Sequence, residues 1–391
     1  MASIAIQHEM NAARTGQPLA LYVHWPFCVS KCPYCDFNSH VRASIDQNEW
    51  REALLADLAH EAKLLPDRRL SSIFFGGGTP SLMDPATAGA IIDAAKQHWS
   101  ASDDLEVTLE ANPNSAEAEK FADLARAGVN RISLGLQSFD DQSLAFLGRA
   151  HSADEGLKAL ESAQNAVDRV SFDLIYALPT DTEVGWAAHL DRAIGLGTEH
   201  LSLYQLTIEP GTRFATMVAK HEFEPLDADQ SANLFELTQE RTAAAGTPAY
   251  EISNHARPGA ESRHNLAYWR YQDYAGIGPG AHGRRLGMRT VRHRKPENFI
   301  SAVTRNTHGI SEEELLTPEE GAHEALVMGL RLAEGIEPAA LSARLNGQAL
   351  VDERSVDRMV GYGLLERDGP RIRTSPAGRL LLDSILAEIA A

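Results

Sequence analysis

Short apolar runs alternate with amphipathic stretches over most of the first two thirds of the chain. The apolar runs, rich in β-branched and aromatic side chains, predict strands at residues 19–25, 71–75, 105–111, 131–137, 170–177 and 200–208. Helical spacing of apolar positions predicts helices at residues 50–64, 86–98, 116–127, 153–166, 185–196 and 227–245. Such alternation predicts right-handed βαβ units, and six units predict an α/β fold with a partial (β/α)6 barrel.

The pattern changes after residue 310. The segment SEEELLTPEE, residues 311–320, interrupts the alternation and predicts a domain boundary. Helical stretches at 321–333, 338–345 and 353–361 precede residues 363–386, which predict a hairpin and a final helix. We therefore expect a mobile N-terminal tail at 1–18, the barrel at 19–246, an accessory segment at 247–310 and a small winged-helix-like domain at 311–391.

Composition and charge narrow the class of protein. The chain is 43% hydrophobic and 23% charged, which is typical of soluble globular proteins. No run approaches the roughly 18 apolar residues of a membrane span, and residues 1–18 lack the features of a signal peptide, so we expect a cytoplasmic protein. The net charge of −18 argues against a nucleic-acid partner. Residues 312–391 carry eight Arg, no Lys and 15 acidic residues, which favours a lid or partner-docking module over a DNA reader.

The only three cysteines of the chain, Cys28, Cys32 and Cys35, lie within eight positions. An odd number in a reducing compartment does not predict a disulfide framework. Pro26 and Pro33 do not suit a helix interior, so the cysteines are expected on a loop that wraps around a metal.

Two metal sites fit these cysteines. Zinc could be completed by His24 or His40, although structural zinc sites prefer two separated pairs of ligands, and no second pair follows. A 4Fe–4S cluster held by three thiolates would instead leave one iron open for a substrate or cofactor.

Polar residues follow the ends of several predicted strands. The cysteine loop follows the first predicted strand, GGGTPS (residues 76–81) follows the second strand, and EPGT (209–212) follows the sixth strand. Glu110 closes the third strand, Gln137 closes the fourth strand, and Asp173 lies in the fifth strand. In β/α barrels the carboxyl ends of the strands form the active site. The glycines could simply end a strand, and the two acids could be structural, but an acid in an apolar strand is costly unless paired or ligand-bound.

These residues together resemble the radical S-adenosylmethionine (SAM) superfamily, with CVSKCPYC similar to its cluster loop and GGGTP similar to its SAM-binding turn. The resemblance implies that Cys28, Cys32 and Cys35 hold a 4Fe–4S cluster and that the amino and carboxylate groups of SAM chelate the open iron. One-electron reduction then yields a 5′-deoxyadenosyl radical, with the protein supplying orientation and exclusion of water.

A closer resemblance, from about residue 21 to the C-terminus, is to the oxygen-independent coproporphyrinogen III oxidase group, through LYVHWPFC, LGLQSF, FDLIYALP and GIGPGAHG. It implies that Asp173 binds the ribose hydroxyls of SAM and that Tyr34 lies near the adenine. By its own context in FLGRAH, Arg149 could be a surface helix residue or could neutralise a carboxylate on a ligand. The positions that match SAM contacts are Tyr22, Tyr34, Gly77, Gly78, Thr79, Glu110, Gln137, Arg149 and Asp173.

Two departures point to a sister group, the HemW haem chaperones. The oxidases carry a fourth cysteine where this chain has Phe37, and a longer segment before the loop than the 27 residues found here. The motif HNLAYW, which begins at His264, and the segment YEISNHA resemble this sister group and imply haem binding. His264 is a candidate haem ligand, and Tyr268 and Trp269 offer flat apolar area to a porphyrin, while the alternative is a hydrogen-bonded histidine at a packed helix end.

The sequence therefore predicts a protein that binds a 4Fe–4S cluster, SAM and haem and transfers haem to an acceptor protein of unknown identity. The alternatives are oxidative decarboxylation of coproporphyrinogen III and radical chemistry on another substrate, because fold and cofactor do not fix the substrate.

Overall fold

A computed structural model describes residues 15–42 and 44–391. Most of the predicted N-terminal tail, residues 1–14, lies outside the described residues, and Pro18 already belongs to the first strand. Among the described residues, no helix combines the length and apolar character that crossing a membrane requires.

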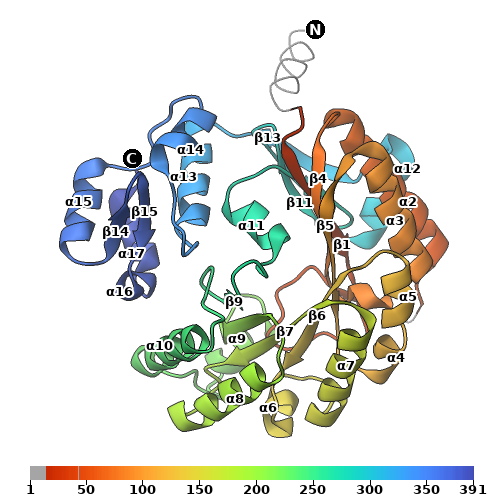
Figure 1. Ribbon diagram of the computed structural model, residues 1–391. Coiled ribbons are helices and arrows are strands. Elements are labelled where there is room, and N and C mark those ends of the chain that lie inside the picture. The colour runs from red at the N-terminus through yellow and green to blue at the C-terminus, as the bar shows by residue number, and fades with distance from the viewer. Residues whose placement is uncertain (1–14, 43) are drawn as a thin grey trace.

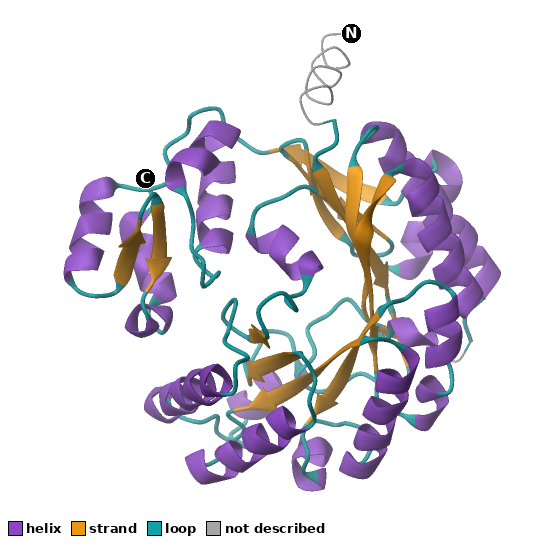
Figure 2. Ribbon diagram, viewed as in Figure 1, coloured by secondary structure: helices purple, strands orange, loops and turns teal. Residues whose placement is uncertain are grey.

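The centre of the molecule is a curved sheet of parallel strands with helices on its convex side (Figures 1 and 2). Its strands are β1 (Pro18–Trp25), β4 (Arg69–Gly77), β5 (Ser100–Ala111), β6 (Arg131–Gln137), β7 (Arg169–Tyr176) and β8 (His200–Gln205), paired in that order. The covering helices are α2 (Gln47–Leu64), α3 (Pro85–His98), α4 (Ser115–Ala118), α5 (Phe121–Arg126), α6 (Asp141–Phe146), α7 (Ala153–Ala166), α8 (Glu183–Gly195) and α10 (Ala228–Ala244). The six predicted strands are thus confirmed.

Local sequence explains most of these boundaries. Every residue of β6 is buried, as expected for a strand covered on both faces. Helix α7 begins at a capping box in which Ser152 and Glu155 each accept from the other's backbone N–H. The predicted helix at 116–127 is instead two short helices, α4 and α5, separated by Glu119 and Lys120.

The accessory segment extends the sheet at both edges. At one edge, β9 (Asn254–Ala256) pairs with β8. At the other edge, β10 (Tyr274–Ile277) pairs parallel with β1. Three antiparallel strands follow β10, namely β11 (His282–Arg285), β12 (Met288–Arg292) and β13 (Ile310–Leu315), and α12 (Pro296–Asn306) precedes β13. Residues 311–315, predicted as the start of a break, therefore form an edge strand. Its acidic side chains are stable there because Glu313 and Glu314 pair with Arg285 and Arg289.

A buried ion cluster fixes these added strands to α2. Arg292 on β12 lies against Asp57 and Glu61, and Arg285 on β11 lies 2.7 Å from Glu61, all four side chains being almost fully buried. Burial opposes ionisation of Glu61, but the charges of Arg292 and Arg285 outweigh it and hold its pKa below the usual value.

Helix α11 (Arg263–Trp269), which carries HNLAYW, lies on the concave side of the sheet (Figure 1). Glu106 of β5 accepts the backbone N–H groups of Arg263 and His264, at 3.2 and 3.1 Å, and so holds the helix N-terminus inside the barrel.

The C-terminal part has its own apolar core and lies beside α11 (Figure 1). It contains α13 (Pro318–Gly329), α14 (Pro338–Arg344), α15 (Glu353–Gly361), the hairpin β14 (Leu365–Asp368) and β15 (Arg371–Thr374), α16 (Pro376–Arg379) and α17 (Leu382–Ile389). The three helices, hairpin and final helix predicted here are confirmed. Arg379 donates to Gln239 of α10, which ties this part to the far edge of the barrel.

Candidate functional site

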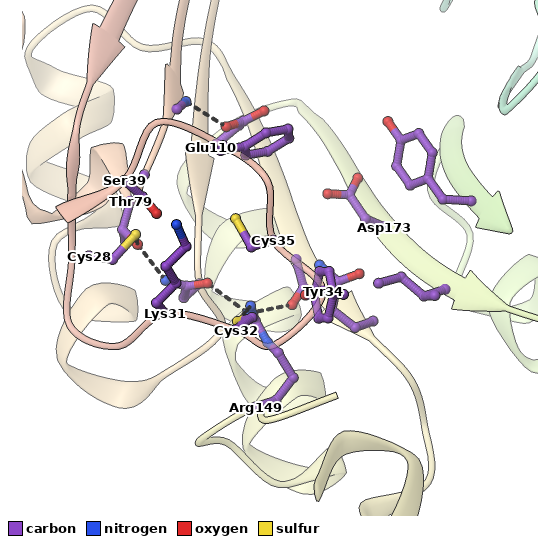
Figure 3. Close-up of a pocket in the computed structure, with 18 of the residues that line it drawn as sticks. Cys28, Lys31, Cys32, Tyr34, Cys35, Ser39, Thr79, Glu110, Arg149 and Asp173 are labelled. Carbon is purple, nitrogen blue, oxygen red and sulfur yellow. Dashed lines mark hydrogen bonds between the residues drawn. The ribbon is translucent and has the colours of Figure 1, made fainter. Parts of the chain in front are cut away.

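The carboxyl ends of the parallel strands surround a cavity of about 300 Å³ (Figure 3). All three cysteines line it, and so do eight of the nine predicted SAM positions: Tyr34, Gly77, Gly78, Thr79, Glu110, Gln137, Arg149 and Asp173. Residues from five strands and their loops thus converge as the barrel geometry requires.

The cysteine loop follows β1 and is braced by a short pairing of β2 (Phe27–Cys28) with β3 (His40–Val41). The three thiols are free and half-buried, and Figure 3 shows them on the opposite side of the cavity from Asp173. Thr79 donates to the sulfur of Cys28 and Arg149 to that of Cys32, each at 3.5 Å. Donors aimed at sulfur are the protein groups that tune an iron–sulfur cluster, so this donor set fits one.

His24 is not free to complete a zinc site. Its Nε2–H donates to the Asn38 carbonyl at 2.9 Å, so its Nδ1 accepts from the Tyr22 hydroxyl at 3.0 Å. Burial lowers the pKa of His24 to about 4, which keeps the ring neutral with both nitrogens engaged.

The turn after β4 is bound to the cysteine loop through its backbone. Gly78 donates to the Trp25 carbonyl and Thr79 to the Phe27 carbonyl, at 2.7 and 2.8 Å. A Cβ on Gly78 would lie 2.6 Å from the Phe27 carbonyl oxygen, and one on Gly77, whose φ is 111°, would lie 2.6 Å from the His24 ring. Glycine is therefore required at both positions, because a side chain on Gly78 would separate the turn from the loop, and one on Gly77 would collide with His24 at a φ that favours glycine. The 3-10 helix η1 (Pro80–Leu82) continues the turn.

Two carboxyl groups face the cavity without an ion pair to any described residue, those of Glu110 and Asp173. Glu110 accepts the Gly77 N–H at 3.3 Å, and Asp173 accepts from Ser133 at 3.4 Å. Burial, followed by the charge of Asp173, raises the pKa of Glu110 to about 8, and burial raises that of Asp173 to about 6. Half-buried acids with no ion pair among the described residues are suited to a cationic or hydroxyl-bearing ligand.

Gln137 closes β6 in a strained conformation. Its φ of 66° is rare for a residue other than glycine, and its buried Oε1 has no hydrogen-bond partner among the described residues. An orphaned acceptor at the wall of a cavity fits a ligand that donates to it.

Arg149 is positioned by a residue that the sequence analysis missed. The Asn112 side chain accepts from Arg149 at 2.6 Å and donates to Thr79 Oγ1 at 2.8 Å, so it links the arginine to the glycine turn. Its position two residues after Glu110 was the available signal. Tyr204 and Lys31 also line the cavity and were not predicted.

Tyr22 and His264 lie outside this cavity. Tyr22 lines a neighbouring cavity of about 330 Å³ on the other side of Gly77 and Glu110. The His264 side chain is inside the barrel, only 3% exposed, with its Nδ1 bonded to the Ser72 hydroxyl at 3.0 Å and its ring stacked on Phe74. Burial lowers its pKa to about 3.

A partial parallel barrel with a three-cysteine loop at its carboxyl rim is the architecture of the radical SAM class. The family model of the radical SAM superfamily matches residues 22–193, and that of the HemN C-terminal domain matches residues 316–381. The solved structure of coproporphyrinogen III oxidase (HemN) from Escherichia coli superposes with a TM-score of 0.81 over 97% of this chain and 91% of that one, at 21% identity, which supports the fold.

Sequence identity to several other proteins is higher than the 21% identity to this oxidase. The heme chaperone HemW of Escherichia coli is 35% identical over 94% of this chain and 97% of its own length, and that of Mycobacterium tuberculosis is 34% identical over 96% and 95%. The mouse mitochondrial radical S-adenosyl methionine domain-containing protein 1 is 37% identical over 98% and 92%. The chain belongs to the radical SAM superfamily, in the family that contains these HemW proteins. The cofactors of that superfamily are a 4Fe–4S cluster and SAM.

Proposed function

We propose that this protein binds haem and transfers it to an acceptor protein, using a radical SAM barrel as its scaffold. The observation that carries the proposal is the similarity to proteins named heme chaperone HemW, which extends over nearly the whole of both chains. An acceptor of unknown identity remains part of the proposal. A cytoplasmic location is likewise part of the proposal and not a finding, because the relatives include proteins named mitochondrial.

The residue roles belong to the same proposal. Cys28, Cys32 and Cys35 would hold the cluster, which would supply one-electron chemistry towards SAM. Glu110 takes up the SAM ammonium, which gives that buried acid the counter-charge it lacks. Asp173 accepts from the ribose hydroxyls.

The remaining cavity residues complete the SAM site. The Arg149 guanidinium, oriented by Asn112, neutralises the SAM carboxylate, and Gln137 offers its unpartnered Oε1 to a donor on SAM. Tyr34 packs beside the adenine, while the amide groups of Gly77, Gly78 and Thr79 form the wall nearest the cluster loop.

We also propose the predicted division of the chain, with one adjustment. Strand β13 is paired with β12, so the boundary of the C-terminal domain falls after Leu315, close to the start of the HemN C-terminal match.

The second candidate function is oxygen-independent coproporphyrinogen III oxidation, which the HemN-like fold favours. Phe37 argues against it. This side chain, 56% exposed, stands where the oxidase group carries a fourth cysteine and lies between the two cavities.

An anaerobic assay separates the two functions. Reconstituted protein is incubated with coproporphyrinogen III, SAM and a reductant, and both protoporphyrinogen and 5′-deoxyadenosine are measured, with an authentic oxidase in parallel. We expect 5′-deoxyadenosine from a competent cluster without any porphyrin product. Protoporphyrinogen formed over many turnovers would make the protein an oxidase.

A further inference from the structure

The second cavity, beside the predicted SAM site, has no assigned occupant. It lies between β1, β4 and the added strands β10 and β11, and it shares Phe37, Gly77 and Glu110 with the first cavity. Its volume of about 330 Å³ is in the range of ligand pockets. A ligand there would be next to the SAM site, with only the Phe37 ring and the glycine turn between the two.

Aromatic rings form much of its wall. Tyr22 comes from β1, Tyr274 from β10 and Tyr268 from the HNLAYW helix, and the rings of Tyr268 and Tyr274 lie 4.2 Å apart. Flat apolar faces of this kind suit a planar conjugated ligand. The motif thus reaches the cavity through Tyr268, while the His264 ring, whose centroid is 5.0 Å from that of Tyr268, does not line the cavity.

The imidazoles near the cavity differ in availability. Both nitrogens of His24 are engaged, whereas His264 has an unpartnered Nε2 among the described residues but is buried and does not line the cavity. His282, at the start of β11, is exposed and lines the cavity. Partial burial, with the charges of Arg294 and Arg289, lowers the pKa of His282 and so favours the neutral form of the ring, which is the form that binds a metal.

A cation lies beside this imidazole. Arg294 lines the same cavity and is exposed, and its backbone carbonyl accepts from the Asn38 side chain at 2.9 Å. A guanidinium at the mouth of an aromatic cavity suits a carboxylate on the ligand's edge. An aromatic wall, an imidazole and a surface cation are features that suit a carboxylated metalloporphyrin.

We propose that haem binds in this second cavity with His282 as its axial ligand and Arg294 on a propionate. The inference rests on the proposed haem function and names the site where that function resides. Tyr268 forms part of the wall, and His264 acts as a positioning residue that holds Tyr268 and α11 in place through Ser72 and Phe74.

The test is a haem titration of the full reconstituted chain, followed by the Soret band and the electron paramagnetic resonance of ferric haem. His282→Ala is expected to weaken haem binding about tenfold or more and to change the Soret position, with added imidazole restoring the spectrum. His264→Phe, which retains a ring against Phe74, is expected to keep the wild-type spectrum. His323→Ala on α13 removes an exposed histidine elsewhere and serves as the control.

The outcomes separate the inference from the function on which it rests. Wild-type spectrum and affinity in His282→Ala would overturn the inference and leave haem binding intact, and so would a lost ligand signature in His264→Phe with native circular dichroism. A wild-type protein that binds no haem would overturn both. Arg294→Gln is expected to weaken binding without moving the Soret band, and a change in iron ligation there would contradict the role given to Arg294.

Discussion

Two glutamates on β5 should respond in opposite directions to the same substitution. Glu106 and Glu110 are four residues apart, on the same face of one strand. Glu106 lies 2.7 Å from Arg169 and accepts two backbone N–H groups of α11. Burial opposes its ionisation, but the charges of Arg131 and Arg169 prevail and hold its pKa below the usual value, whereas burial raises that of Glu110 to about 8.

Whether each substitution stabilises or destabilises the protein at a given pH follows from how the pKa of the glutamate changes on folding. The pKa of Glu110 rises from 4.5 on folding, so its contribution to stability is fully present below pH 4.5 and is lost as the pH rises towards 8. At about 1.4 kcal/mol per pH unit, Glu110→Gln should be about 3 to 5 kcal/mol more stable than wild type at pH 8 and no more stable near pH 4.5. Glu106→Gln leaves two arginines without their buried partner and should lose about 3 to 5 kcal/mol at pH 7. Its deficit narrows only below pH 4.5, where the wild-type carboxylate also begins to take up a proton.

The assay is urea unfolding of both variants and wild type from pH 4 to 8, followed by far-ultraviolet circular dichroism, without SAM. A Glu110→Gln protein that is less stable than wild type at pH 8, or whose advantage does not grow with pH, would refute the unpaired-acid argument. The same variant should bind SAM more weakly, because the ammonium loses its carboxylate.

Three other substitutions test the cluster loop, the glycine turn and the buried ion cluster. Cys32→Ala is expected to abolish the brown absorbance of the reconstituted cluster, and a full cluster in this variant would contradict the ligand set. Gly78→Ala brings a Cβ within 2.6 Å of the Phe27 carbonyl oxygen, so the turn must separate from the cysteine loop; iron content and SAM affinity should both fall, and normal values would show that the contact is relieved elsewhere. Glu61→Gln removes the buried carboxylate that Arg285 and Arg292 share, leaves them only Glu313 and Asp57 as partners, and should cost about 3 to 5 kcal/mol in urea unfolding. Glu52→Gln on the exposed face of α2 should change stability little, and equal effects would contradict the role of the ion cluster.

The barrel was predictable because its signals are local. Each parallel strand is an apolar run bounded by polar or glycine residues. Cys28 follows the first strand, Glu110 lies near the end of the third and Asp173 lies within the fifth, so their convergence required only the rule that carboxyl ends meet at one rim. The β12–β13 pairing was missed because its strands read as polar. Glu313 and Glu314 are stable in β13 only through arginines on neighbouring strands, which is information that a single segment does not hold.

Side-chain orientation was the other feature that could not be predicted from the sequence. HNLAYW predicts aromatic and imidazole groups near a ligand, but which of them faces the cavity depends on how Glu106 anchors the N-terminus of α11 across the barrel. That contact joins residues 158 positions apart. Tyr268 therefore reaches the second cavity while His264 is buried, and the role of Asn112 likewise becomes visible only when Arg149 and Thr79 are brought together.

The central claim is that this radical SAM barrel is a haem carrier, and titration of the reconstituted wild-type protein with haem tests it most directly. We expect a saturable Soret difference signal with a single class of site. Absorbance that rises linearly with haem and never saturates, as for haem adsorbed at no defined site, would contradict the account.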